Sequence, residues 1–199
     1  MGTVYAETNA ATVRILARNG YEVVIPKRQT CCGALAIHAG ERNIAKEMAK
    51  RNIDAFLEAD STSGGLPAAI IVNAAGCGVA LKEYKDLLKE DPAYAAKARH
   101  FSELIKDATE FLAAPDIEKP TREIRARVTY QDPCHLAHGQ GIRSQPRALL
   151  NLIPGLQLVE MRDSDRCCGS AGIYNVTHPD LSTQILDEKM VNITSTQPD

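Results

Sequence analysis

The sequence has 199 residues, 44% of them hydrophobic, and a formal net charge of −2. This length suits one large domain or two small ones. The weak charge, and a content of three Phe, six Tyr and no Trp, argue against a nucleic-acid partner. The sequence has neither an apolar run of the roughly 18–20 residues that span a membrane nor an N-terminal secretory signal. We therefore expect a cytoplasmic location.

The first half opens with a helical pattern over residues 8–18. A strand-like apolar run follows over residues 19–26. The triplet Cys-Cys-Gly comes next, at 31–33, and an amphipathic helix is predicted over 41–57. Residues 68–73 form a continuous apolar run, which is typical of a strand buried on both faces.

The middle of the chain contains the predicted domain boundary. Residues 79–114 are charged and rich in alanine, which favours helix, and residues 113–123 contain two prolines and indicate a linker. We place the boundary near residue 122, with one domain over 1–122 and the other over 123–199.

The second half repeats the order of the first. A strand is predicted over 126–130, a helix over 143–153 and a strand over 154–161. A second Cys-Cys-Gly triplet follows at 167–169, and then a helix over 179–192. Helix, strand, triplet and helix thus occur twice, which indicates an internal duplication.

The helices that follow the two triplets can be aligned if one residue is inserted. Strands that alternate with helices predict an α/β fold with mainly parallel sheets, here as two tandem domains. The corresponding apolar positions are Ile44 and Leu181, Met48 and Ile185, and Phe56 and Ile193.

The cysteines are the candidate functional residues. In a reducing cytosol such cysteines are more often metal ligands, reactive thiols or buried small residues than disulfides, and a disulfide between sequence neighbours is strained. Three thiols beside glycines at the predicted ends of strands favour a metal or redox site over inert core cysteines. The six are Cys31, Cys32 and Cys77 in the first half, and Cys134, Cys167 and Cys168 in the second.

Adjacent cysteines also constrain the kind of metal. Two neighbouring thiolates are awkward ligands for one tetrahedral zinc and suit a polynuclear centre better. Soft thiolates favour an iron–sulfur cluster or zinc, and the spacing does not choose between them. His135 and His138 follow Cys134 closely, and we interpret them as packing or capping residues of a helix start. No arrangement of catalytic residues stands out.

Two stretches carry a resemblance to a known family. YQDPCHLAHGQGIRSQPRALLNLIPGLQLVEMRDSDRCCGSAGIYN (130–175) and TNAATVRILARNGYEVVIPKRQTCCGALAIHAGE (8–41) are similar to the cysteine-rich CCG domain. Relatives with this domain include heterodisulfide reductase B-type subunits and lactate-utilisation iron–sulfur proteins. The chain resembles in particular the glycolate oxidase iron–sulfur subunits, over almost its whole length.

The resemblance implies a function. It implies that all six cysteines are ligands of iron–sulfur clusters, of the 4Fe-4S type. FAD-containing glycolate oxidase subunits would oxidise glycolate to glyoxylate, and this chain would relay the electrons towards the quinone pool. Such an oxidoreductase subunit would have no activity alone, and its partners would hold it at the inner face of the cell membrane.

The chain also departs from the family pattern. The N-terminal ferredoxin-like segment, the opening cysteine of the first motif and the closing cysteine of the second have no counterpart in residues 1–199. We therefore expect the sequence to be part of a longer protein, with incomplete ligand sets. Two alternatives remain: a thiol/disulfide redox module like that of heterodisulfide reductase, and a zinc-stabilised scaffolding module.

Overall fold

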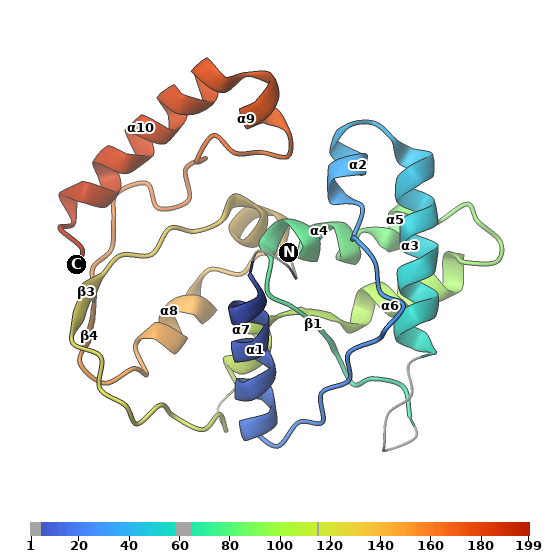
Figure 1. Cartoon of the computed structure of the whole chain (residues 1–199), viewed down its shortest axis with the longest axis horizontal. Coiled ribbons are helices and arrows are strands. Elements are labelled where there is room, and N and C mark those ends of the chain that lie inside the picture. Colours follow the sequence, from blue (N-terminus) through green and yellow to red (C-terminus); the bar gives the residue numbers. More distant parts are fainter. Residues whose placement is uncertain (1–4, 59–64, 115) are drawn as a thin grey trace. The chain divides into compact units, whose positions relative to one another are not determined.

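The computed structural model describes residues 5–58, 65–114 and 116–199 and divides the chain into two compact units, Met1–Glu118 and Lys119–Asp199 (Figure 1). In the described residues, each unit has a sheet of two parallel strands with helices around it. The predicted α/β fold with parallel sheets is therefore confirmed. That the duplicated domains run over 1–122 and 123–199 stays a prediction.

The first unit contains short helices and a small parallel sheet. Its described elements, in chain order, are α1 (Ala6–Arg18), α2 (Ala34–His38), α3 (Arg42–Leu57), β1 (Ile70–Val72), α4 (Ala75–Lys82), α5 (Tyr84–Leu87), α6 (Ala95–Leu104), β2 (Ile105–Asp107) and α7 (Ala108–Leu112).

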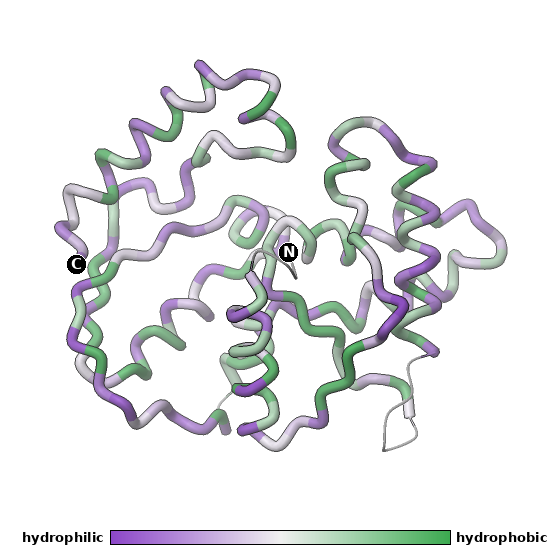
Figure 2. Tube along the Cα trace, in the orientation of Figure 1, coloured by the Kyte–Doolittle hydropathy of each residue, from purple (hydrophilic) through white to green (hydrophobic). Residues whose placement is uncertain are grey.

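The sheet of the first unit pairs β1 with β2, with Ile70 opposite Ile105. The continuous apolar run predicted to be a strand contains β1, and Figure 2 shows it as an unbroken hydrophobic stretch. Helix α4 begins directly after β1 and contacts both strands. The loop after β1 is therefore fixed against the sheet.

Two predictions for the first unit are wrong. Residues 21–26 form no strand: they pair with no other strand in the described chain, and Ile25 is 62% exposed. The region 79–114 is not helical throughout, because β2 interrupts it. Ile105 in β2 is 1% exposed, so its burial in the sheet outweighs the helical tendency of the residues before it.

One hydrophobic core joins the helices of the first unit to its sheet. The Phe101 ring stacks on Tyr84 at 5.4 Å and meets Phe56 edge-on at 6.0 Å, both between centroids. Cys32 packs against this core, which links the first cysteine pair to the best-packed part of the unit. The core consists of Ala45, Ala49, Ile53, Ile70, Leu81, Tyr84, Leu87, Leu88, Ala98, Phe101 and Ile105.

The second unit is smaller and pairs β3 with β4, Ala126 lying opposite Leu156. A helix connects the two parallel strands, as a parallel pair requires. Its described elements are β3 (Ala126–Val128), the π-helical turn η1 (His135–Gly139), α8 (Ser144–Leu150), β4 (Leu156–Leu158), α9 (Tyr174–Thr177) and α10 (Pro179–Ser195).

Helix α10 of the second unit shows polar and apolar residues in alternation (Figure 2). Leu181 and Val191 on this helix are exposed, while Ser182 and Lys189 are buried. The inward face of α10 therefore carries polar side chains. None of the described helices is long and apolar enough to cross a membrane.

Candidate metal centres

The two Cys-Cys-Gly triplets form the same local turn. The glycines, Gly33 and Gly169, adopt left-handed backbones with φ of 77° and 84°. In each triplet the glycine N–H donates to the sulfur of the first cysteine, at 3.5 Å for Cys31 and 3.3 Å for Cys167. Glycine adopts this conformation without the strain that a side chain would bring, which explains why it follows each cysteine pair.

Each turn also packs against the helix that follows it. A Cβ atom on Gly33 would lie 3.5 Å from the Cα of Ala45 in α3, and one on Gly169 would lie 2.4 Å from the backbone oxygen of Ser182 in α10. Ala45 and Ser182 correspond when the two halves are aligned as Ile44 with Leu181. The duplication predicted from the sequence therefore extends to the packing of the turns.

The three cysteines of the first unit interact with one another, although they do not converge as closely as ligands of one metal ion. Cys77 lies in the first turn of α4, and a hydrogen bond from the Cys32 thiol lowers the pKa of Cys77 to about 7. The same bond, together with burial, raises the pKa of Cys32. Cys31 is the exposed member and interacts with both. The Cys32 thiol therefore donates to Cys77, and this contact favours the thiolate form of Cys77 over that of Cys32.

Two buried polar side chains fix the backbone of the first cysteine pair. Asn52 in α3 is 2% exposed; its amide nitrogen donates to the Cys31 carbonyl at 3.0 Å, and its oxygen accepts from the N–H of Thr30 at 2.8 Å. Tyr84 in α5 is fully buried, accepts from Asn52 at 3.1 Å and donates to the Cys32 carbonyl at 2.8 Å. Both carbonyls of the pair are therefore tied to the core.

The second unit places its cysteines on two joined loops. Cys134 lies at the start of η1, where the loop after β3 ends, and Cys167 and Cys168 lie in the loop after β4. The N–H of Asp132 donates to the Ser164 carbonyl at 3.0 Å, and the Ser164 hydroxyl donates to the Asp132 carboxylate at 2.7 Å. The two loops therefore lie together at the carboxyl ends of the parallel strands.

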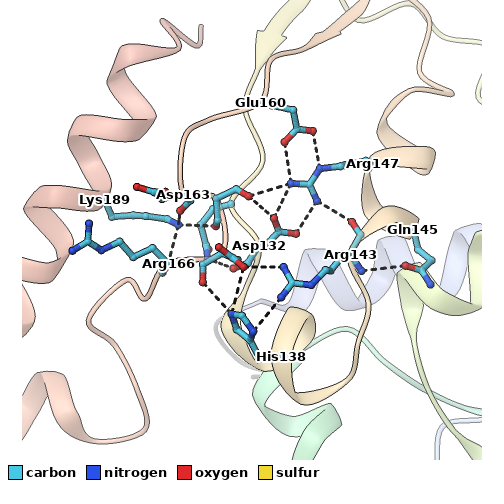
Figure 3. A network of polar contacts seen from close by, with 12 residues as sticks. Asp132, His138, Arg143, Gln145, Arg147, Glu160, Asp163, Arg166 and Lys189 are labelled. Carbon is cyan, nitrogen blue, oxygen red and sulfur yellow. Dashed lines mark hydrogen bonds and ion pairs between the residues drawn. The ribbon is translucent and has the colours of Figure 1, made fainter.

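Arg147 in α8 holds these loops together (Figure 3). Its guanidinium donates two hydrogen bonds of 2.7 Å to the buried carboxylate of Asp132 and one of 2.7 Å to Glu160. This contact keeps the pKa of Asp132 below its usual range, although burial opposes the shift. A bidentate pair of this kind fixes geometry as well as charge.

His138 takes part in the same group of polar contacts (Figure 3). One ring nitrogen lies 3.1 Å from the Arg143 guanidinium, and the other lies 3.4 Å from the backbone oxygen of Asp165. Arg143 in turn forms an ion pair of 2.9 Å with Asp165. Both ring nitrogens thus contact the protein, and the side chain is 55% exposed, so the interpretation of His138 as a packing or capping residue stays a prediction.

Side chains of helix α10 also bind the loop that contains Cys167 and Cys168. The buried Lys189 ammonium donates to the carbonyls of Asp163, Ser164 and Arg166. The Ser182 hydroxyl donates to the Gly169 carbonyl at 2.8 Å.

Sequence reasoning missed the supporting residues Asn52, Tyr84, Arg147 and Lys189. One signal was present, because Asn52 and Lys189 each lie four residues after a corresponding apolar position, Met48 and Ile185. A polar residue one turn along an apolar face is often buried with a partner.

The donor chemistry of both units fits a soft metal or an iron–sulfur cluster. All six thiols are free, and the carbonyls of the first pair and the loop of the second are fixed by buried side chains. In the arrangement that the structure describes, however, no three His, Cys, Asp or Glu side chains converge closely enough to bind a metal ion. The fit therefore rests on donor type and on the two matching turns.

Comparison with known proteins identifies the class of protein. The profile of the cysteine-rich CCG domain matches residues 1–82 and 128–199, which together contain both triplets and all six cysteines. The chain therefore belongs to the CCG cysteine-rich domain family.

Particular relatives can also be named. The chain is 42% identical over 199 residues to the probable glycolate oxidase iron-sulfur subunit of Bacillus subtilis (strain 168), and 39% identical over 198 residues to the glycolate oxidase iron-sulfur subunit of Escherichia coli (strain K12). These matches cover 99% of this chain but 44% and 47% of the relatives, so the chain spans about half their length. It is 32% identical to lactate utilization protein A of Geobacillus kaustophilus (strain HTA426), over 98% of this chain and 79% of that protein.

Proposed function

We propose that the chain is an electron-transfer component that binds iron–sulfur clusters through its two cysteine groups. The observation that carries this proposal is the pair of matching Cys-Cys-Gly turns, each with a left-handed glycine whose N–H donates to the first sulfur. An N–H group directed at a thiolate sulfur stabilises its negative charge and so favours thiolate ligands. Two findings support the proposal: the chain belongs to the CCG family, and it is similar to two proteins that are named iron-sulfur subunits.

The residues that would hold the clusters are the six cysteines. When bound, a cluster supplies reversible one-electron chemistry, and we propose the 4Fe-4S type. The chain itself orients the ligands: Asn52 and Tyr84 fix the peptides of the first pair, and Arg147 fixes the two loops of the second unit. The ligand groups would be Cys31, Cys32 and Cys77 in the first unit, and Cys134, Cys167 and Cys168 in the second.

The names of the relatives support a proposal for the partner reaction. We propose that FAD-containing subunits oxidise glycolate, or a related 2-hydroxy acid, and that this chain passes their electrons towards the quinone pool. The chain would then act within an oxidoreductase complex and would have no catalytic residue for the acid itself. A cytoplasmic position, held at the inner face of the membrane through these partners, remains part of the proposal.

The direct experiment follows the electrons. The protein, isolated without oxygen, is mixed with the FAD-containing subunits, and glycolate is added while visible absorbance is recorded. We expect the broad absorbance of the cluster to bleach, and a Cys32→Ser, Cys168→Ser variant to show no bleaching. If glycolate reduces the flavin and leaves the cluster oxidised, the proposed relay is wrong.

Two other functions are separated by simple measurements. Zinc without iron in the isolated protein, with unchanged activity of the complex after Cys→Ser substitution, would favour the scaffolding module. Turnover of a disulfide substrate with reduced viologen would favour the thiol/disulfide module.

A further inference from the structure

Lys189 is a buried cation for which the proposed electron relay has assigned no role. Its side chain lies on the inward face of α10, and the residue is 1% exposed. The Nζ atom lies 3.1 Å from the Asp163 oxygen, 2.7 Å from the Ser164 oxygen and 3.0 Å from the Arg166 oxygen, all backbone carbonyls (Figure 3). An ammonium group has three N–H donors and a neutral amine has two, so three carbonyl acceptors select the charged form.

The charge of Lys189 has no direct counter-ion. The described residues place no carboxylate in an ion pair with it, and the carboxylates around it, those of Asp132, Asp163 and Asp165, each pair with an arginine. Burial lowers the pKa of Lys189, while the nearby Cys168 side chain and the carboxylates of Asp132, Asp165 and Asp163 oppose this. The ammonium therefore contributes positive charge to the surroundings of the second cysteine pair.

The first unit has a neutral residue at the corresponding position. In the alignment that matches Ile44 with Leu181 and Phe56 with Ile193, Asn52 corresponds to Lys189. Both side chains are buried on the helix after a Cys-Cys-Gly turn, and both bond to the backbone of the residue just before the cysteine pair, Thr30 or Arg166. The duplicated position thus keeps its contact with the loop but differs in charge between the units.

We propose that Lys189 is a positioning residue that also raises the reduction potential of the metal centre in the second unit. This inference rests on the proposed function, because it needs a centre held by Cys134, Cys167 and Cys168. Reduction adds one electron to the centre, and a fixed positive charge beside the loop that contains Cys167 and Cys168 stabilises the reduced form. Asn52 also bonds to the cysteine loop of its unit, by accepting from the Thr30 N–H and donating to the Cys31 carbonyl, but it carries no charge.

The test is a potentiometric titration of the second centre, followed by electron paramagnetic resonance. The full chain carries Cys31→Ser and Cys77→Ser so that the first centre is removed, and it is reconstituted with iron and sulfide. Lys189→Met and Lys189→Gln remove the charge, Lys189→Arg keeps it, and Arg125→Met removes an 83% exposed charge of the same unit as a control. Circular dichroism shows whether each variant is folded.

We expect Lys189→Met and Lys189→Gln to lower the reduction potential, with Lys189→Arg and Arg125→Met close to the parent protein. Equal potentials in all folded variants, with clusters bound, would overturn the inference and leave the proposed function standing. A parent protein that takes up no iron and sulfide would overturn both the inference about Lys189 and the proposed function. If the neutral variants do not fold, the reduction potentials of the two centres are compared directly. The Cys167→Ser, Cys168→Ser protein then reports the centre of the first unit. A reduction potential of the second-unit centre at or below that of the first-unit centre contradicts the inference.

Discussion

The glycine of the second triplet is required for two reasons: its backbone is left-handed, and another chain segment packs closely against it. Gly169 combines a φ of 84° with a site in which a Cβ would lie 2.4 Å from the Ser182 oxygen. Gly141, in the same unit, has a φ of 70° and open space around its Cα. A comparison of alanine variants at Gly169 and Gly141 therefore separates the free-energy cost of the left-handed backbone from that of the steric clash.

The corresponding alanine variants should differ in stability. Gly141→Ala should lower the free energy of unfolding by about 1–2 kcal/mol, the cost of a left-handed alanine. Gly169→Ala should cost more, by a further 1–3 kcal/mol or so, because α10 must move away from the turn. Urea unfolding measures both, and equal losses for the two variants would show that the predicted contact with Ser182 is absent.

The role of the Tyr84 hydroxyl group can also be tested by substitution. Tyr84→Phe removes the bond to the Cys32 carbonyl and leaves Asn52 without one acceptor, while the stacked ring remains. We expect a loss of about 1–3 kcal/mol in the free energy of unfolding, typical of a buried polar group left unpaired. Tyr21→Phe, at a tyrosine that is 45% exposed, is the control and should change little. A neutral Tyr84→Phe variant would mean that the hydroxyl does not fix the cysteine pair.

At the level of elements, the helices were the most predictable part of the fold. The long amphipathic segments became α3 and α10, and the apolar run 68–73 became β1, because their patterns match the period of the element. The run at 21–26 also contains consecutive apolar residues but forms no strand, since a strand needs a paired neighbour that a local pattern does not reveal. Strand β2 was missed for the opposite reason: it has three residues, and its place is fixed by pairing with β1.

A capping box marks the end of β2. Asp107 caps α7 by accepting from the N–H of Thr109, and Glu110 bonds back to the N–H of Asp107. Lys82 and Lys106 also donate to the Glu110 carboxylate. Burial alone would raise the pKa of Glu110, but the two ammonium groups outweigh it, and the pKa is lower than the usual 4.5.

This lowered pKa predicts a pH dependence of stability. Because the carboxylate form is favoured in the folded state, the contribution of Glu110 is complete above its unfolded pKa and is lost as the pH falls through the lower folded pKa. The wild-type protein should exceed Glu110→Gln in free energy of unfolding by about 1 kcal/mol at pH 7, with the difference shrinking below about pH 4. Urea titrations at both pH values measure this. A difference that does not change with pH would contradict the assignment.

At the level of the whole molecule, the sequence revealed the duplication but not what supports it. The two triplets and the α/β class with parallel sheets could be predicted from local patterns, but the repeated order of the elements was only partly correct, because residues 21–26 form no strand and β2 was missed. The roles of Asn52, Tyr84 and Lys189 could not be predicted, because their partners are backbone carbonyls of distant loops. Polar residues that bind main chain have no complementary residue type in the sequence, so a buried position can be suspected from the helix pattern but only the fold shows which groups are bound.

The central claim is that the six cysteines bind iron and sulfide. The most direct measurement is the iron, acid-labile sulfide and zinc content of the protein isolated and reconstituted without oxygen. It is made on the wild type and on two triple variants, Cys31→Ser, Cys32→Ser, Cys77→Ser and Cys134→Ser, Cys167→Ser, Cys168→Ser. We expect iron and sulfide in the wild type and a loss of about half in each triple variant, since each unit would hold its own centre. Zinc alone, or iron and sulfide content that neither triple substitution lowers, would contradict it.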